Sequence, residues 1–263
     1  MNILPQINPK QETKKIVEFL KKIKKKTKKD KVVIGLSGGI DSTVAHYLLK
    51  KAYKPENIIS VSLPYEKIKP IINEVAGVEK KGFPTARRSV DIRRLSSTGG
   101  NEFETGPATL KKIRYGNIMA RVRMIILFDL AKKYDALVCG TENKSERLLG
   151  YFTRFGDAAS DIEPITYLYK TQVYQLAKYL KVSQKIIDAP PTAGLWQGQT
   201  DEAEFGFSYI EADQFLYLYI DKKIPLKKIK LKNAEKIIKR VLNNQFKQEV
   251  PYSLLRETKS AKL

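Results

Sequence analysis

The order of apolar and polar residues predicts an amphipathic helix near the start of the chain. Within residues 9–29, four apolar residues recur at the spacing of one helix face: Ile16, Phe19, Leu20 and Ile23. Lysines fill many of the positions between them, so we expect a basic face turned to solvent. Asn8 and Pro9 stand where an N-cap and a first helical residue are preferred.

Two short apolar runs predict buried, parallel strands. The runs KVVIGL (31–36) and NIISVSL (57–63) are rich in β-branched residues, and such runs are typical of strands covered on both faces. Residues 40–53 between them have the pattern of a helix. Two buried strands joined by a helix form a βαβ unit, which implies a parallel sheet.

The rest of the chain continues to alternate between strands and helices. We predict further strands at 87–92 and 136–141, and further helices at 109–133, Glu142–Leu149, 168–180, 208–220 and 231–245. No repeat of fixed period interrupts the pattern. The sequence therefore predicts one α/β domain over residues 1–263, with a doubly wound parallel sheet and helices on both faces. It begins with the basic helix and ends in a helix and tail at about 231–263.

The composition indicates which kinds of partner and which cellular compartment to expect, but it does not identify a function. The 263 residues include 49 Lys and Arg against 28 Asp and Glu, a formal net charge of +21. This excess favours anionic partners such as nucleotides, nucleic acid or membrane surfaces, although a solvated lysine-rich face explains it more simply. The single cysteine, Cys139, excludes a disulfide within the chain. Because we find no apolar run near the roughly 18 residues of a membrane span and no signal-peptide pattern, we expect a cytoplasmic protein without membrane contact.

The loop after the first predicted strand carries the chemistry. In open α/β sheets, ligands bind beyond the carboxyl ends of the strands, which is where the stretch GLSGGIDS (35–42) lies. Its glycines let an anion approach the backbone closely. Four successive N–H groups can form an anion-binding nest before the next helix: those of Ser37, Gly38, Gly39 and Ile40. The loop therefore predicts a phosphate site.

This phosphate loop is of neither common type. A Walker A loop requires a lysine directly after the last glycine, and none follows before Lys50; the G-x-G-x-x-G pattern of dinucleotide-binding folds is absent too. Asp41 stands there instead, and a carboxylate among phosphates is repulsive unless a cation lies between them. Asp41 therefore implies Mg²⁺, which is often held by carboxylates together with phosphates. A simple helix-start carboxylate is the alternative interpretation.

The motif S-G-G-x-D-S at 37–42 resembles the pyrophosphate loop of the N-type ATP pyrophosphatases, which cleave ATP between its α- and β-phosphates. Three further strings resemble the ammonia-dependent NAD synthetase family: GNIMAR (116–121), GTENKSERLLGYFTRFGDAASDIEPITYLYK (140–170) and PPTAGLWQGQTD (190–201). The resemblance spans roughly residues 12–250 and implies an adenine nucleotide alpha-hydrolase-like fold. It also implies amidation of deamido-NAD (nicotinic acid adenine dinucleotide) by ammonia, with ATP as co-substrate and Mg²⁺ as cofactor. An acyl adenylate would be the intermediate, and NAD, AMP and pyrophosphate the products.

The same resemblance implies roles for individual residues. The ATP contacts would be Gly35, Leu36, Ser37, Gly38, Gly39, Ile40, Asp41, Ser42, Thr141, Lys170 and Thr192. Asp41 and Glu146 match Mg²⁺ carboxylates, and Asp41 and Lys170 are the expected catalytic residues. The deamido-NAD contacts would be Arg121, Arg154, Asp161 and Lys247. Two positions depart from the family: Arg154, where lysine is usual, and Phe246, where histidine is common.

The resemblance also predicts the partners. Free ammonia is the expected nitrogen donor, because the chain is too short for an added amidohydrolase domain. We expect a homodimer with deamido-NAD bound near the subunit interface, and the apolar helix at about 109–133 is the candidate dimer element. Glycines in the segments 98–108 and 193–206 suggest lids over the substrate.

Two other functions remain open on the sequence. A tRNA-modifying ATP pyrophosphatase would account for the basic charge, but no appended RNA-binding domain is visible, so we do not expect nucleic acid as a partner. The second alternative is a nucleotide-binding or scaffold protein whose catalytic site is degraded. Such a protein would not have to keep its catalytic residues, whereas Asp41, Glu146 and Lys170 are all present here.

Overall fold

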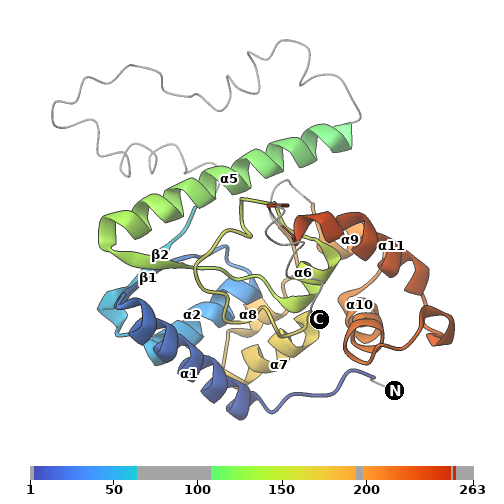
Figure 1. Ribbon diagram of the computed structural model, residues 1–263, viewed down its shortest axis with the longest axis horizontal. Helices are drawn as coiled ribbons and strands as arrows, with labels where there is room; N and C mark the ends of the chain where they lie inside the picture. Colours follow the sequence, from blue (N-terminus) through green and yellow to red (C-terminus); the bar gives the residue numbers. More distant parts are fainter. Residues whose placement is uncertain (1–2, 64–107, 194–197, 250, 253–263) are drawn as a thin grey trace, which may run out of the picture.

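The computed structural model of the protein describes residues 3–63, 108–193, 198–249 and 251–252 (Figure 1). The strand predicted at 87–92 lies outside these residues. So do residues 98–107 of the lid predicted at 98–108. The lid predicted at 193–206 is described in part, and it is helical from Asp201 onward.

A parallel sheet in the order β2-β1-β3 forms the centre of the described structure. Its strands are β1 (Lys31–Gly35), β2 (Ile58–Val61) and β3 (Ala136–Cys139). Val33 of β1 pairs with Ile59 on one side and with Val138 on the other. The predicted βαβ unit is therefore confirmed, and a parallel bridge between Cys139 and Ile162 continues the pairing beside β3.

Helices cover both faces of the sheet (Figure 1). The four that do so are α1 (Pro9–Thr27), α2 (Ile40–Ala52), α5 (Ala108–Tyr134) and α7 (Lys170–Tyr179). Helices α1, α2 and α7 share a buried apolar cluster with Val32 and Ile34 of β1, whereas α5 shares another with Val33. Successive residues of β1 thus meet apolar partners on opposite faces. This confirms the doubly wound arrangement and explains why the strand is apolar throughout.

Helix α1 begins where its sequence predicts. The Asn8 side chain accepts a hydrogen bond from Gln11 N at 3.2 Å, as an N-cap does, and Pro9 is the first helical residue. The helix ends at Thr27, two residues before the predicted limit. Lys28 stops it by adopting a left-handed conformation with φ of 57°.

A second apolar cluster lies beside the sheet and is built by the C-terminal helices (Figure 1). Its helices are α6 (Lys144–Leu149), α9 (Asp201–Phe205), α10 (Tyr209–Leu216) and α11 (Ala234–Asn244). The Phe205 ring stacks on Phe207 with centroids 5.4 Å apart, and Tyr151 meets Phe205 edge-on at 4.6 Å. The helix predicted at 208–220 is α10 followed by a π-helical turn, η3 (Tyr217–Asp221).

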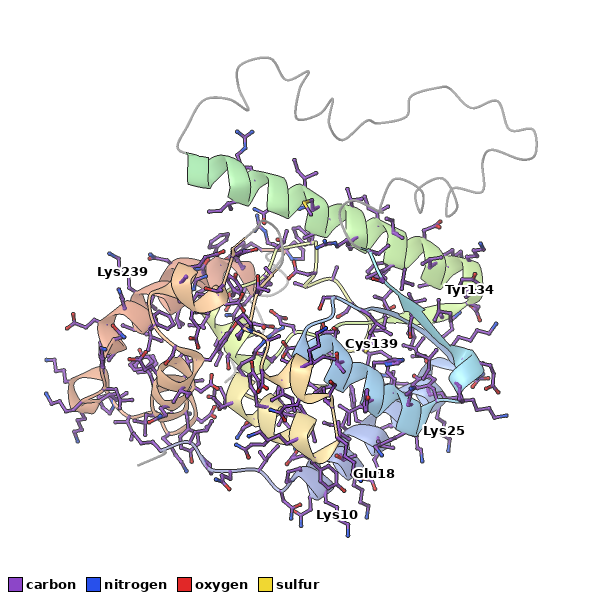
Figure 2. The ribbon with its side chains drawn as sticks, turned by 180° about the vertical axis from the view of Figure 1, so that it is seen from behind. Lys10, Glu18, Lys25, Tyr134, Cys139 and Lys239 are labelled. Carbon is purple, nitrogen blue, oxygen red and sulfur yellow. The ribbon has the colours of Figure 1, made fainter. Side chains whose placement is uncertain are left out.

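Short helical segments lie between the longer helices and strands, and lysines lie on the outer faces of the helices. The short segments are η1 (Pro55–Asn57), α8 (Gln184–Ile187), η4 (Leu226–Lys228) and η5 (Gln245–Lys247). Figure 2 shows Lys10 and Lys25 of α1 and Lys239 of α11 pointing away from the interior. None of the helices in the described part of the chain is both long enough and apolar enough to cross a membrane.

Gly150 permits the closest approach between α6 and α11. It ends α6 with φ of 63°, and a Cβ placed on it would lie 2.2 Å from Cβ of Asn244. A side chain at this position would therefore meet both backbone strain and a steric clash. Since α6 carries part of the site described below, this contact sets where α6 sits against α11.

We predict that Gly150→Ala lowers the free energy of unfolding by about 1–3 kcal/mol, because it adds a methyl group to a closed contact at positive φ. Urea denaturation of the two proteins measures the difference. Gly198→Ala is the matched control, because Gly198 has φ of 77° and a Cβ added there would meet no atom within 4 Å, so it tests backbone strain alone. Equal losses in both variants would contradict a role for the Asn244 contact.

Candidate active site

The loop between β1 and α2 is held by its own serines. Ser37 N donates to Ser42 Oγ at 3.3 Å, and Gly39 N donates to Ser37 Oγ at 3.1 Å. Gly38 has φ of 85°, which glycine adopts without strain. Two of the four N–H groups predicted to face an anion therefore bind serine oxygens in this structure, and contacts within the loop fix its shape.

Asp41, in the first turn of α2, contacts residues from two other parts of the chain. Its Oδ1 accepts a hydrogen bond from Asn143 Nδ2 at 3.0 Å, and its Oδ2 accepts one from Lys170 Nζ at 2.5 Å. Lys170 is the first residue of α7. The two residues predicted to be catalytic, Asp41 and Lys170, therefore form a direct ion pair.

Glu146 joins the same ammonium group. Lys170 Nζ lies 3.1 Å from Glu146 Oε1, and Lys170 is only 2% exposed. Asn143 and Glu146 form a capping box at the start of α6, in which Glu146 N donates to Asn143 Oδ1 at 3.0 Å. One buried ammonium thus connects the first turns of α2, α6 and α7.

Burial and charge together set the protonation of this cluster. Burial alone would lower the pKa of Lys170, but the carboxylates of Asp41 and Glu146 outweigh it and raise that pKa above its usual value. Burial raises the pKa of Glu146, Lys170 opposes the rise and Asp41 adds to it. The amine therefore stays an ammonium, and a further cation beside the two carboxylates would relieve their repulsion.

The Asp41–Glu146 pair fits a magnesium site completed by a substrate. Within residues that the structure describes, no cluster of three or more His, Cys, Asp and Glu side chains is placed to hold a metal ion. Mg²⁺ is commonly bound by one or two carboxylates together with phosphate oxygens and water. Asp41 and Glu146 could supply the carboxylates of such a site, and the loop of 35–42 beside Asp41 could receive the phosphate.

A fully buried aspartate of α10 fixes the helices that carry Glu146 and Lys170. Asp213 Oδ1 accepts from Ser145 Oγ at 2.5 Å, and Asp213 Oδ2 accepts from Thr171 N and Thr171 Oγ1, both at 2.8 Å. Ser145 Oγ in turn accepts from Lys170 N at 2.8 Å. Burial raises the pKa of Asp213 to about 6. Asp213 thus ties the second apolar cluster to the ends of α6 and α7.

A third carboxylate, Asp201, is linked to the cluster through Tyr209. Tyr209 OH donates to Asp201 Oδ2 at 2.9 Å, and the Tyr209 ring centroid lies 5.1 Å from Lys170 Nζ. Burial raises the pKa of Asp201. Asp201 N donates to Pro191 O at 3.0 Å, which brings the exposed Thr192, a predicted ATP contact, close to Asp201 in the fold.

A cavity of about 430 Å³ gathers three of the four residues predicted to bind deamido-NAD: Arg154, Asp161 and Lys247. The fourth, Arg121 of α5, donates from Nη2 to the Arg154 carbonyl at 3.3 Å. Residues that lie 126 positions apart in the chain, from Arg121 to Lys247, are therefore neighbours of one cavity.

Aromatic rings and carbonyl groups hold the two cations of this cavity. The Arg154 guanidinium lies 5.5 Å from the Phe155 ring centroid and 5.4 Å from that of Phe246, within cation–π range. Lys247 Nζ donates to the Gly150 carbonyl at 2.8 Å, and burial lowers the pKa of Lys247. Phe246, where the family usually has histidine, thus contacts Arg154.

Two predicted residues lie at the end of β3. Thr141 follows the strand by two positions and is half-buried. Asp161 Oδ2 accepts from Val138 N at 2.8 Å, so Asp161 fixes the edge of β3 as well as lining the cavity. The cavity and the phosphate loop therefore both lie at the carboxyl ends of strands, as expected for an open parallel sheet.

The sequence prediction left out four residues that the structure places in or beside the site: Asn143, Asp201, Asp213 and Glu142. Three of them lie inside strings that carry the resemblance, G-T-E-N-K-S-E and G-Q-T-D, so a signal for them is present. Asp213 lies in a helix without a motif. It stands between Glu211 and Gln214 in a mixed polar and apolar stretch, so the sequence does not single it out.

Comparison with known proteins gives one consistent family. The family model described as NAD synthase matches residues 12–251. The NH(3)-dependent NAD(+) synthetase of Fusobacterium nucleatum is 38% identical over 251 residues, covering 93% of this chain and 95% of its own. That of Pyrococcus furiosus is 37% identical over 243 residues, covering 90% of this chain and 91% of its own.

Solved structures agree with these relatives. The structure of NMN synthetase from Francisella tularensis has a TM-score of 0.71 at 33% identity, covering 94% of this chain and 99% of its own. The NH3-dependent NAD synthetase from Campylobacter jejuni has a TM-score of 0.65 at 28% identity, covering 94% of this chain and 99% of its own.

We predict that Asp213→Asn lowers the free energy of unfolding by about 3 kcal/mol, because an amide cannot accept all three hydrogen bonds that the carboxylate accepts. Chemical denaturation measures the loss. Asp188→Asn is the control, because Asp188 is exposed and accepts one side-chain hydrogen bond, from Gln184; a change within about 0.5 kcal/mol is expected there. If the Asp213 variant were as stable as the control, Asp213 would not fix α6 and α7.

Proposed function

The chain belongs to the NAD synthase family, and from this membership we propose that it catalyses the ATP-dependent amidation of deamido-NAD by ammonia. ATP adenylates the nicotinate carboxylate and pyrophosphate leaves. Ammonia then attacks the acyl adenylate, which gives NAD and AMP. The observation that carries this proposal is the match to the NAD synthase model over residues 12–251 in a chain whose Asp41, Glu146 and Lys170 meet at one point.

The residues around Lys170 suit the adenylation step. Asp41 and Glu146 would hold Mg²⁺, which would neutralise charge on the phosphates of ATP. The loop of 35–42 would bind the departing pyrophosphate through the N–H groups that its serines do not hold and through the α2 dipole. Lys170 keeps a fixed positive charge beside that pyrophosphate, and fixed charges of this kind stabilise the charge that builds up in the transition state. Thr141 and Thr192 would contact ATP as well.

The cavity suits the second substrate. Arg154 and Lys247 supply positive charge for the pyrophosphate and carboxylate of deamido-NAD, with Arg121 and Asp161 contributing at its edge. Because Phe246 lacks the hydrogen-bonding groups of the histidine usual there, we infer that this position contributes by contact with Arg154 and with apolar parts of the substrate.

A second candidate function is the same amidation on a mononucleotide. It is favoured by one observation, the likeness to the NMN synthetase of Francisella tularensis at a TM-score of 0.71. Nicotinic acid mononucleotide carries the same carboxylate, so the adenylation chemistry is unchanged and only the AMP half of the dinucleotide is missing. The curated relatives at 37% and 38% identity favour the dinucleotide. A tRNA-modifying ATP pyrophosphatase is not favoured by these relatives.

Product analysis tests the proposal. We expect purified protein with MgATP, deamido-NAD and ammonium chloride to form NAD, AMP and pyrophosphate in equal amounts. Nicotinic acid mononucleotide, supplied in parallel, should give a lower kcat/KM. A higher kcat/KM for the mononucleotide would select the second candidate, and an absence of ATP cleavage with either substrate would contradict both.

We predict that Asp41→Asn lowers kcat by about 100-fold or more, because it removes a charge on which magnesium and Lys170 both depend. Steady-state assays of NAD formation measure the effect, with circular dichroism to check folding. Asp188→Asn, an exposed substitution directly after α8, is the control and should leave kcat unchanged. Turnover by a folded Asp41 variant at the control rate would contradict the metal role.

We also propose that the protein is a homodimer in the cytoplasm, assembled through α5. Two apolar residues of this helix are exposed, Ile113 at 43% and Ile125 at 61%, and burying them against a partner subunit would remove apolar surface from water. The single cysteine, Cys139, suits a reducing compartment because the chain forms no internal disulfide.

We predict that Ile125→Glu converts the dimer to a monomer at micromolar concentration, because it places a charge in an apolar contact. Sedimentation velocity measures the mass. Ile210→Glu is the matched control, because Ile210 of α10 is also 61% exposed, and it should leave the dimer intact. A wild-type monomer, or a dimeric Ile125 variant, would contradict assembly through α5.

A further inference from the structure

Glu142 places an unpaired carboxylate oxygen in the wall of the substrate cavity. The residue follows Thr141 at the end of β3 and is 8% exposed. It lines the cavity of about 430 Å³ together with Arg154 and Lys247. Among the residues that the structure describes, none donates a hydrogen bond to its buried Oε1. A buried carboxylate oxygen that accepts no hydrogen bond destabilises the fold, so a bound molecule that donates a hydrogen bond to it would be favoured.

The neighbouring carboxylate, Glu163, is fully engaged and holds Glu142 in place. Glu163 Oε1 accepts from Ser160 Oγ at 2.7 Å, and Glu163 Oε2 accepts from Glu142 N at 3.2 Å. Gly140 makes this possible, because a Cβ there would lie 1.8 Å from Glu163 Oε1. Glu163 therefore orients the backbone of Glu142, and the Glu142 side chain lines the cavity.

The charges around Glu142 engage only one of its oxygens. Among the described residues, Glu142 forms one long ion pair, from Arg147 Nη1 to Oε2 at 3.8 Å, and none to Oε1. Burial raises the pKa of Glu142 to about 8, Glu163 and Glu146 raise it further and Arg147 lowers it, so a cation bound beside Glu142 would favour its ionised form. A carboxylate in this setting gains from a small donor cation and is a stronger proton acceptor than an exposed one.

We propose that Glu142 Oε1 binds the ammonium ion in this cavity and takes its proton, so that ammonia is released beside the activated carboxylate of the substrate. The proposal rests on the proposed amidation and deepens it by naming the place of the third substrate. An ammonium ion carries positive charge and four N–H donors and has no acceptor, which complements a buried carboxylate. At Glu142 itself a phosphate or a carboxylate of the substrate would be repelled, whereas Arg154 and Lys247 of the same cavity attract such groups.

The proton transfer balances with the amidation. Ammonium gives one proton to Glu142, which becomes neutral. The lone pair of ammonia then forms the C–N bond to the nicotinoyl carbon, and the C–O bond to AMP breaks with its electron pair leaving on AMP. The new nitrogen loses a second proton to solvent, which leaves the amide, and Glu142 returns its proton to solvent before the next cycle.

The test compares Glu142→Gln, Glu142→Asp and wild type in steady-state assays of NAD formation. We expect the KM for ammonium to rise roughly 10-fold or more in the Gln variant, because a charge-assisted hydrogen bond is lost. The KM for deamido-NAD should stay within about twofold, since Glu142 does not bind that substrate. The Asp variant, which keeps a carboxylate, should recover part of the ammonium affinity. Glu235→Gln, exposed on α11, controls for the loss of one surface charge.

Pyrophosphate exchange separates this proposal from the proposed function. Without ammonia, adenylation of deamido-NAD is reversible and should incorporate labelled pyrophosphate into ATP, in wild type and in the Gln variant alike. Exchange in both proteins with an unchanged ammonium KM would overturn the ammonium site alone. A raised KM for deamido-NAD with an unchanged ammonium KM would also overturn it and would assign Glu142 to a substrate hydroxyl. An absence of exchange in wild type would overturn the amidation, and the ammonium site with it.

Discussion

One buried ammonium group organises the site. Lys170 Nζ bonds to Asp41 from α2 and to Glu146 from α6, while Lys170 itself begins α7. Removing an amine from water is costly, and so is placing two carboxylates side by side; each cost is offset only by the other group. The first turns of three helices must therefore meet at this point. Because α2 and α7 pack on the parallel sheet and α6 belongs to the second apolar cluster, this contact also joins the two clusters beside the phosphate loop.

The second constraint comes from the C-terminal helices. Asp213 of α10 receives three hydrogen bonds from the residues that flank Glu146 and Lys170. Gly150 and Lys247 bring α11 and the turn after it against the end of α6. The second apolar cluster, which lies beside the sheet, therefore also positions residues of the site. It fixes α6, which carries Glu146 of the charged cluster and ends at Gly150, whose carbonyl accepts a hydrogen bond from Lys247 of the cavity.

The sequence predicts the parts of this arrangement that depend on local pattern. The apolar runs predict β1 and β2, the 3.6-residue period predicts α2 and α5, and the glycine-rich loop with Asp41 predicts a magnesium-phosphate site. Glu146 and Lys170 come from the family resemblance, since no spacing in the chain brings them to Asp41. Contacts of high sequence separation escape both routes. Asp213 lies 68 positions from Ser145. Likewise, only the folded structure shows that Oε1 of Glu142 is buried and that no described residue donates a hydrogen bond to it.

A double-mutant cycle on Lys170 and Asp41 tests the organising contact most directly. Free energies of unfolding would be measured without magnesium or nucleotide for Lys170→Met, Asp41→Asn and the double variant. Each single variant should lose about 3 kcal/mol or more, because it leaves a buried charge without its partner. The double variant should lose clearly less than the sum of the two. Additive losses would show that the two groups act independently, and the three helix ends would then owe their meeting to packing rather than to Lys170.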